Sequence, residues 1–186
     1  AKLAENGLLQ LYRDVELPLT WILAQMEIVG VKVDVPYLEK LQVEFDERIR
    51  AIEKDIEIMA GEPVNPNSPK QLGHILFEVL ELPVVKKTKP GYSTSAGVLE
   101  ALRDSHPIVG RVLDYRQLAK LKSTYVDGLL KLVDAHDRVH TSFNQTVTAT
   151  GRLSSTAPNL QNIPVRTEEG KRIRRAFIPI EKKNLL

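Results

Sequence analysis

The segment from Thr148 to Pro164 concentrates side chains that can form hydrogen bonds. It holds one arginine, several hydroxyls and three amides between a strand-like segment and a basic cluster. A plain core segment has no need of so many polar groups, because each would require a partner if it were buried. Arg152 offers five donors in a rigid fork, and an amide can both donate and accept. The amides are Asn159, Gln161 and Asn162.

These donors suit the minor groove of a nucleic-acid duplex, which presents base N3 and O2 acceptors at nearly every pair. Side chains that bond these acceptors hold a base pair while remaining largely blind to its sequence. A turn-rich connector whose amides bond its own backbone is the alternative. The stretch Gly151–Leu186 also carries eight Lys and Arg against three acids, which suits a polyanion or a solvated charged surface.

Two earlier segments could also contact phosphates. Ser68 is predicted to be a helix N-cap, with Pro69 at the first helical position and Gln71 three residues after the cap. The N–H groups of this helix start, with Lys70 beside them, could bind a phosphate, although capping alone explains the same residues. The loop from Lys86 to Ser95 is polar and cationic, and we expect it to be mobile and either solvated or near a phosphate backbone.

A third candidate is a row of polar side chains on one helix face. At 100° per residue, Arg116, Lys120, Ser123 and Thr124 share a face opposite a leucine stripe. Two cations and two hydroxyls without an interleaved acid suit a phosphate backbone. An ordinary solvent-exposed face fits the same residues equally well.

Two long helices are predicted to position these groups. The segment Pro36–Ala60 carries an apolar seam at spacings of three and four residues, roughly 37 Å long at 1.5 Å per residue. The second helix runs from about Pro107 to Ala135. Because about 46 residues separate the two helices, we expect an antiparallel pair with a small subdomain at its tip. The seam comprises Leu38, Leu41, Phe45, Ile49, Ile52, Ile56 and Met59, and the facing stripe comprises Leu118, Leu121, Tyr125, Leu129 and Leu132.

Shorter elements surround this pair. A helix is expected over residues 7–30, with a start signal at Pro18 and a stop at Gly30, followed by an extended link to Asp34, which can cap the next helix. A tip helix is expected over about residues 96–104.

The pattern changes after Asp137. Residues 139–150 alternate with a period of two and contain many threonines, which predicts a half-buried strand. A later strand over about residues 176–180 would lie beside it or join the same sheet. The sequence therefore predicts an α+β chain, mainly helical, followed by the first strands of an incomplete antiparallel sheet.

Composition limits the class of protein. The 186 residues have a net charge of +2, 42% hydrophobic content and no cysteine, which fits a folded chain and excludes disulfides and thiolate metal sites. No apolar run approaches the roughly 20 residues that a membrane span needs. We expect a soluble, cytoplasmic chain with no membrane partner.

Five ordered blocks of this sequence together resemble family A DNA polymerases, the DNA polymerase I family. The blocks are Leu17–Asp34, Asn67–Leu72 with Ser93–Ser95, Leu118–Tyr125, Arg138–Pro164 and Glu168–Phe177. One departure is Ala157, where the family usually has Asp or Glu. This puts an acid-mediated contact at that position in doubt and leaves the arginine and the amides intact.

The resemblance implies a part of a DNA-directed DNA polymerase that acts in replication and repair. It implies a helical thumb over residues 1–136, with its tip at about 61–106, and the start of a palm domain over 137–186. The primer terminus and minor groove would be held by Arg152, Asn159, Gln161 and Asn162. The duplex backbone would be gripped by Asn67, Ser68, Lys70, Gln71, Arg116, Lys120, Ser123 and Thr124.

Catalysis is expected to lie outside this chain. Family A polymerases use Mg²⁺ held by palm aspartates, and no aspartate occurs after Asp137. The first metal-binding aspartate is expected just beyond Leu186. We therefore expect no catalytic residue and no metal ligand here, and we read Glu168, Glu169 and Glu181 as surface carboxylates.

The expected partner of this chain is primer–template DNA, with deoxynucleoside triphosphates bound only by the complete enzyme. The isolated chain should bind DNA without copying it. A split polymerase completed by a second polypeptide, a stand-alone DNA-binding subunit and a helical interaction protein are the alternatives.

Overall fold

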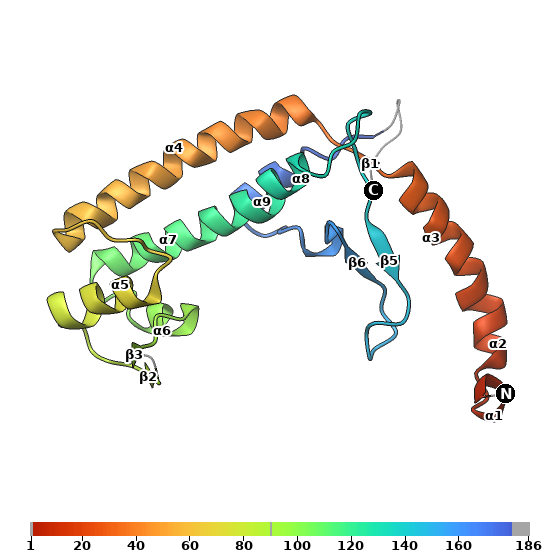
Figure 1. The fold of residues 1–186 in the computed structure, drawn as a ribbon, viewed down its shortest axis with the longest axis horizontal. Helices are drawn as coiled ribbons and strands as arrows, with labels where there is room; N and C mark the ends of the chain where they lie inside the picture. The colour runs from red at the N-terminus through yellow and green to blue at the C-terminus, as the bar shows by residue number, and fades with distance from the viewer. Residues whose placement is uncertain (1, 90, 180–186) are drawn as a thin grey trace. The chain divides into compact units, whose positions relative to one another are not determined.

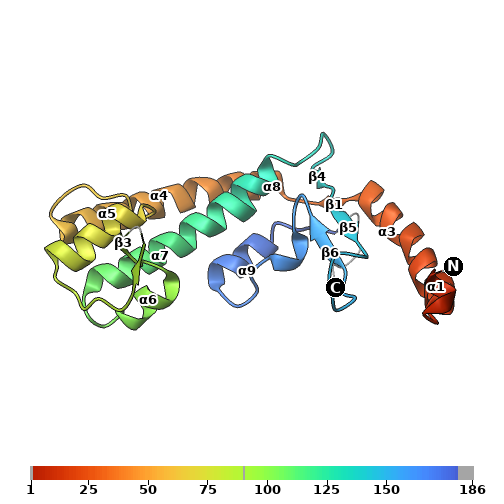
Figure 2. The same ribbon diagram turned by 60° about the horizontal axis from the view of Figure 1, so that its bottom comes forward.

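The computed structural model describes residues 2–89 and 91–179, and the chain divides into two compact units. One unit comprises Ala1–Glu39 with Tyr125–Leu186, and the other comprises Lys40–Thr124. Figures 1 and 2 show the elements of both units. The prediction of a mainly helical α+β chain with short antiparallel strands is confirmed.

In the unit of residues 40–124, helix α4 (Val35–Ala60) packs antiparallel to helix α7 (Pro107–Leu121). Two ion pairs fix this direction. Lys122 Nζ lies 3.2 Å from Asp46 Oδ1, and Arg111 Nη2 lies 3.3 Å from Asp55 Oδ2. The predicted antiparallel pair and the predicted α4 seam are confirmed, because Leu41, Phe45 and Ile56 are at most 1% exposed and Ile49, Ile52 and Met59 pack against the core.

The tip is a small helical layer that shares the core of this pair. It consists of α5 (Pro69–His74), the π-helical turn η2 (Ile75–Val79), the hairpin strands β2 (Lys87–Thr88) and β3 (Gly91–Tyr92), and α6 (Ala96–Ala101). Leu72, Leu76 and Leu99 are fully buried in the same cluster as Ile108 and Val112. Apolar burial of this kind is the main stabilising contribution to so small a layer.

Two expectations for the tip need correction. The segment Lys86–Ser95 is not only a loop, because Lys87 pairs with Tyr92 in a hairpin. The Tyr92 ring, which stacks at 4.9 Å from the Phe77 ring and has Lys87 Nζ 5.5 Å from its centroid, anchors that hairpin on the core. The helix expected over 96–104 ends at Ala101, because turn-like backbone follows it.

The second long helix ends earlier than expected and changes its winding. After α7 comes the π-helical turn η3 (Lys122–Asp127), then α8 (Gly128–Leu130), so the helix ends at Leu130 and not at Ala135. A π turn bonds residues five apart and therefore shifts the side chains that follow it. Val126, at 0% exposure, takes the core position predicted for Tyr125, and Leu132 is 43% exposed.

In the other unit, one of the two-stranded antiparallel sheets is formed by strand β1 (Val31–Lys32). Its partner is β4 (Arg138–Val139), with Val31 opposite Val139. On the next residue, Val33 forms an antiparallel bridge to Phe177. A cluster with Val33, Leu38, Leu129, Val139 and Ala176 at its centre lies beneath these contacts.

The strand expected over residues 139–150 is interrupted and shorter. It splits into β4 and β5 (Ser142–Asn144), and β5 pairs with β6 (Ser154–Thr156). The pairing ends at Asn144, and the side chain of the next residue, Gln145, bonds Glu16 (Nε2 to Oε2, 2.8 Å). Residues 176–178 follow helix α9 (Glu168–Arg174) and pair antiparallel with Lys32, Val33 and Asp34. Of the two expected arrangements, they therefore do not lie beside residues 139–150 but meet the chain at β1, the partner of β4, where they form an isolated bridge and not a full strand. Ile180, at the end of that expected strand, lies outside the described residues, as do Glu181, Lys182 and Lys183.

The N-terminal helix runs from Leu9 to Val29 and ends at Gly30, whose φ of +65° suits a glycine stop. It comprises α2 (Leu9–Leu11), the π-helical turn η1 (Tyr12–Glu16) and α3 (Leu17–Val29), and a short α1 (Lys2–Glu5) precedes it. Pro18 lies inside this run and, as a start signal predicts, at one of the first two positions of α3. A proline ring clashes with the carbonyl four residues earlier in a regular helix, and the wider π turn before it relieves that clash.

His140 links the end of α3 to the strands of the same unit. Its Nδ1 lies 2.7 Å from the Glu27 carbonyl oxygen, and its Nε2 lies 3.2 Å from Asp134 Oδ2. Both partners only accept hydrogen bonds, so this arrangement is best satisfied by the doubly protonated imidazolium. The Glu27 carbonyl, followed by the Asp134 carboxylate, raises the pKa of His140. The backbone N–H of Arg138 is the main cause that lowers the pKa of Asp134 to about 2.

We expect the free energy of unfolding to decrease as the pH rises above 6.5, because His140 then loses its proton. A group with a raised folded-state pKa stabilises fully below its unfolded-state value of 6.5, and this contribution is lost as pH rises through the folded pKa. Asp134 stabilises the folded chain fully above its unfolded-state pKa of 3.8, and this stabilisation is lost as the pH falls toward the folded-state pKa of about 2. Urea unfolding at several pH values would measure this effect. The free energy of unfolding should fall less with rising pH in His140→Asn than in the unsubstituted chain. Equal decreases would contradict this assignment.

Candidate nucleic-acid interface

The polar segment from Thr148 to Pro164 is built around one buried hydroxyl. Ser155 lies in β6 and is 0% exposed. Its Oγ donates to Asn159 Oδ1 at 3.3 Å and accepts from the Leu160 N–H at 3.0 Å. Asn159 Oδ1 also accepts from the Gln161 N–H at 3.1 Å, and so caps the 3₁₀ turn η4 (Leu160–Asn162). The alternative of a connector whose amides bond their own backbone is therefore correct for the side-chain oxygen of Asn159.

Two threonines fix the ends of this segment. Thr141, which is 5% exposed, directs its Oγ1 at the carbonyl oxygens of Thr156 (3.1 Å) and Pro158 (2.8 Å). Thr148 Oγ1 donates to the carbonyl of Arg152 at 2.6 Å. Because these bonds use backbone groups, they order the loop without using the side chains that point outward.

Ala157 occupies a backbone conformation that alanine rarely adopts, with φ of +53°. Asp and Asn enter this left-handed region more readily than other residues with a side chain. Where the resembled family carries Asp at this position, that residue thus has a local conformational advantage over alanine, apart from any contact that it makes.

Several other polar side chains of the segment face solvent. Arg152, Gln161 and Asn162 are exposed, and the bond from Thr148 reaches Arg152 through its carbonyl and not its guanidinium. The three predicted amides therefore lie together, Asn159 as the cap of η4 and the other two within it. Arg152 lies apart from them in sequence, two residues before β6.

Tyr125 is a further residue of this site that the sequence pattern assigned elsewhere. Its hydroxyl donates to the carbonyl of Asn162. Tyr125 was predicted to lie in the core stripe, and the π turn η3 instead leaves it half-buried, beside η4. A regular helical period contains no signal for this shift.

At the tip, the predicted cap of α5 is confirmed. Ser68 Oγ accepts from the Gln71 N–H at 3.4 Å. The reciprocal bond differs from a capping box, because Gln71 Oε1 accepts from the N–H of Asn65 (2.8 Å) and not from that of Ser68. The exposed Lys70 stands beside this ordered turn.

Asn67 connects the same turn to α7. Its Nδ2 donates to the hydroxyl of Tyr115 at 3.3 Å, and its N–H donates to Asn65 Oδ1 at 2.9 Å. Tyr115 is 6% exposed, and burial, followed by the neighbouring Glu53 carboxylate, raises its pKa to about 12. The phenol is therefore a neutral hydrogen-bonding group over the whole physiological range.

The predicted polar row on the second long helix is not uniform. Lys120, Ser123 and Thr124 are exposed, and Ser123 Oγ bonds the Lys120 carbonyl at 3.3 Å. Arg116 is half-buried and turns toward the tip, where Nε donates to the Pro66 carbonyl at 3.0 Å and Nη1 donates to the Thr94 carbonyl at 2.5 Å. Burial lowers its pKa, although a guanidinium stays protonated.

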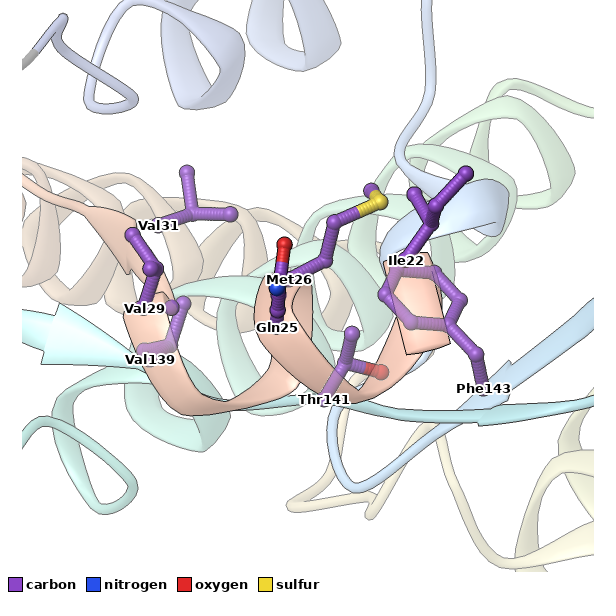
Figure 3. Close-up of a pocket in the computed structure, with 9 residues that line it drawn as sticks. Ile22, Gln25, Met26, Val29, Val31, Val139, Thr141 and Phe143 are labelled. Carbon is purple, nitrogen blue, oxygen red and sulfur yellow. The ribbon is translucent and has the colours of Figure 1, made fainter. Parts of the chain in front are cut away.

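Two concave surfaces lie near these groups, one in each unit. A polar pocket of about 410 Å³ is lined by Arg116, Asn67 and hydroxyls of the tip loop. An apolar pocket of about 300 Å³ lies against α3, with Ile22, Met26 and Phe143 at one end and Val29, Val31 and Val139 at the other (Figure 3). The apolar lining does not suit a phosphate, so only the first pocket fits the polar surfaces described above.

Within residues 2–89 and 91–179, no group of three or more His, Asp or Glu side chains could hold a metal ion. Of the acids considered from the sequence, Glu168 is exposed, as expected of a surface carboxylate, and its Oε1 pairs with Lys171 Nζ at 2.5 Å. No helix in the described part of the chain is long and apolar enough to cross a membrane.

Comparison with known proteins places this geometry in context. The sequence model of DNA polymerase family A matches residues 35–186. DNA polymerase I of Bacillus subtilis (strain 168) is 58% identical over 183 residues, covering 97% of this chain and 21% of the relative. The thermostable DNA polymerase I of Thermus aquaticus is 57% identical over 180 residues, covering 95% and 22%. The chain thus spans about a fifth of the length of these relatives.

A solved structure is also similar. It is the POL domain of Pol1 from M. smegmatis in complex with DNA primer-template and dNTP. Its TM-score is 0.88 at 49% sequence identity, and the match covers 96% of this chain and 32% of that one.

Proposed function

Because the chain belongs to DNA polymerase family A, we propose that it forms the primer–template-binding part of a DNA-directed DNA polymerase. It would supply the thumb and the start of the palm. The complete enzyme would add deoxynucleotides to a primer 3′-OH with release of pyrophosphate. Magnesium ions would supply the activation of the hydroxyl and the stabilisation of the leaving phosphates. No group of acids and histidines among the described residues fits such an ion site, and we place no step through it. The role that we propose for this chain is the binding of DNA.

The observation that carries the proposal is the ordered segment around Ser155. Its internal bonds use a serine hydroxyl, an asparagine oxygen and backbone groups, and they leave Arg152, Gln161 and Asn162 exposed. Ordered donors of this kind can bond the N3 and O2 acceptors of any correct base pair at the primer terminus. Asn159 would contribute through its amide nitrogen while its oxygen caps η4.

The duplex backbone would be gripped at two places. In the tip, the capped start of α5 offers Ser68, Asn67, Gln71 and the cation Lys70. On the second long helix, Lys120, Ser123 and Thr124 are exposed. Contacts of this kind fix the register of a protein on DNA without reading its sequence.

We expect this DNA binding to be strongly salt-dependent. Each phosphate neutralised by a Lys or Arg adds about 0.9 to the magnitude of the slope of log K against log salt. Fluorescence anisotropy with a labelled primer–template between 50 and 200 mM KCl would measure this slope, with a blunt duplex as the control. A slope of about 2 or more, with tighter binding to the primer–template, would support the proposal. Binding that is independent of salt would contradict it and favour a helical interaction protein.

A further inference from the structure

Arg116 differs from the other members of its row in what its side chain bonds. Three of its nitrogens donate to the tip: Nε to the Pro66 carbonyl, Nη1 to the Thr94 carbonyl, and Nη2 to Thr94 Oγ1 at 3.3 Å. Pro66 is buried and Thr94 is only 4% exposed. The guanidinium therefore spans two loops that are 28 residues apart in the sequence, and its fork is directed into the protein.

The two loops that meet on Arg116 lead into two helices. Pro66 precedes the Ser68 cap of α5, and Thr94 precedes Ser95, the N-cap of α6. The neighbouring residue of the same helix, Tyr115, bonds Asn67 in the first of these loops. One turn of α7 thus holds the loop that leads into α5, and this loop and the first turn of α5 together carry four of the proposed backbone contacts.

We propose that Arg116 is a positioning residue for DNA binding and does not itself neutralise a phosphate. By bonding both carbonyls, it would hold the starts of α5 and α6 in one arrangement and shape the polar pocket between them. This inference rests on the proposed DNA-binding function. It replaces the direct contact expected of Arg116, while Lys120 keeps that role.

The planar fork is the property that this role requires. An arginine presents five donors in a fixed geometry, whereas a lysine presents one compact ammonium on a flexible stem. Arg116→Lys therefore keeps the charge and removes the bridge. If Arg116 acted as a cation facing a phosphate, the lysine variant would retain most of the DNA affinity and the full salt slope.

The test compares Arg116→Lys, Arg116→Ala and Lys120→Ala in two measurements. The first is amide hydrogen exchange without DNA. Exchange over residues 65–71 and 93–96 should rise about tenfold in both Arg116 variants and stay unchanged in Lys120→Ala. The second is primer–template binding. Arg116→Lys should weaken it about as much as Arg116→Ala, roughly tenfold, with an unchanged salt slope, whereas Lys120→Ala should reduce the slope by about 0.9.

The two measurements separate the two hypotheses. The positioning role would be overturned if Arg116→Lys showed the same amide exchange in the tip and the same DNA affinity as the unsubstituted chain. If the unsubstituted chain bound DNA without salt dependence, the proposed function would fail. The exchange measurement would still decide whether Arg116 orders the tip.

Discussion

Replacing Arg152 with alanine should weaken binding to a primer–template junction by about tenfold to a hundredfold, and binding to a blunt duplex by less. A good bidentate contact to base edges contributes about 1–3 kcal/mol, which corresponds to this range of affinity. The fold should be little affected, because the guanidinium is exposed and the Thr148 hydroxyl bonds the Arg152 carbonyl, which the substitution keeps.

A neighbouring arginine provides the matched control. Arg166 is exposed, lies in the same basic stretch and has no proposed role in binding. Arg166→Ala should weaken binding to both substrates slightly and equally, through the general electrostatic attraction to DNA. Equal losses on junction and duplex in Arg152→Ala itself would contradict the assignment of Arg152 to the primer terminus. Anisotropy titrations with both substrates at one salt concentration measure all of these effects.

The second large effect is expected on stability, from two adjacent serines. Ser155→Ala should destabilise the protein by about 2–4 kcal/mol, because it leaves the N–H of the half-buried Leu160 without a partner and removes the bond to Asn159. Ser154→Ala is the matched control. Ser154 Oγ is buried and has no hydrogen-bond partner among the described residues, so its removal should be neutral or stabilise by about 1 kcal/mol.

Urea unfolding of the two serine variants measures this difference directly. If both variants lost the same stability, the Ser155 hydroxyl would not be the centre of the loop. Ser155→Ala should also reduce the preference for a primer–template over a blunt duplex, because the 3₁₀ turn that carries Gln161 and Asn162 depends on the same bonds. Ser154→Ala should leave that preference unchanged.

The parts of the fold that depend on near neighbours in the chain were predicted correctly. The apolar seam of α4 follows from the 3.6-residue repeat of the helix, which depends only on the spacing of residues within the helix. The Asp34 cap is confirmed by the Tyr37 N–H, which donates to Asp34 Oδ1 at 3.0 Å, and the Ser68 cap acts over the same distance in sequence. Gly30 ends its helix through its own φ angle. Each of these features involves groups within about four residues, so the sequence alone contains the information.

The composition of the candidate site was also predicted in part. The sequence identified the polar segment from Thr148 to Pro164, but not that Ser154–Thr156 forms a strand within it. Strand pairing depends on a partner about a dozen residues away, and the pattern of residues 139–150 predicted a longer strand than the one that forms. The predicted donor side chains are exposed, as binding to DNA would require. The hydrogen bonds that order the backbone beneath them were not predicted.

Only the tertiary structure decided what Arg116 and Tyr125 do. The helical period placed Arg116 in a solvent-exposed row and Tyr125 in a core stripe. Arg116 instead bonds carbonyls that are 50 and 22 residues away, and Tyr125 bonds a carbonyl 37 residues away. A half-buried donor must find an acceptor wherever the fold brings one. The sequence by itself therefore determined the helices, their caps and the family, and the packing of distant loops decided which polar side chains face solvent and which hold the fold.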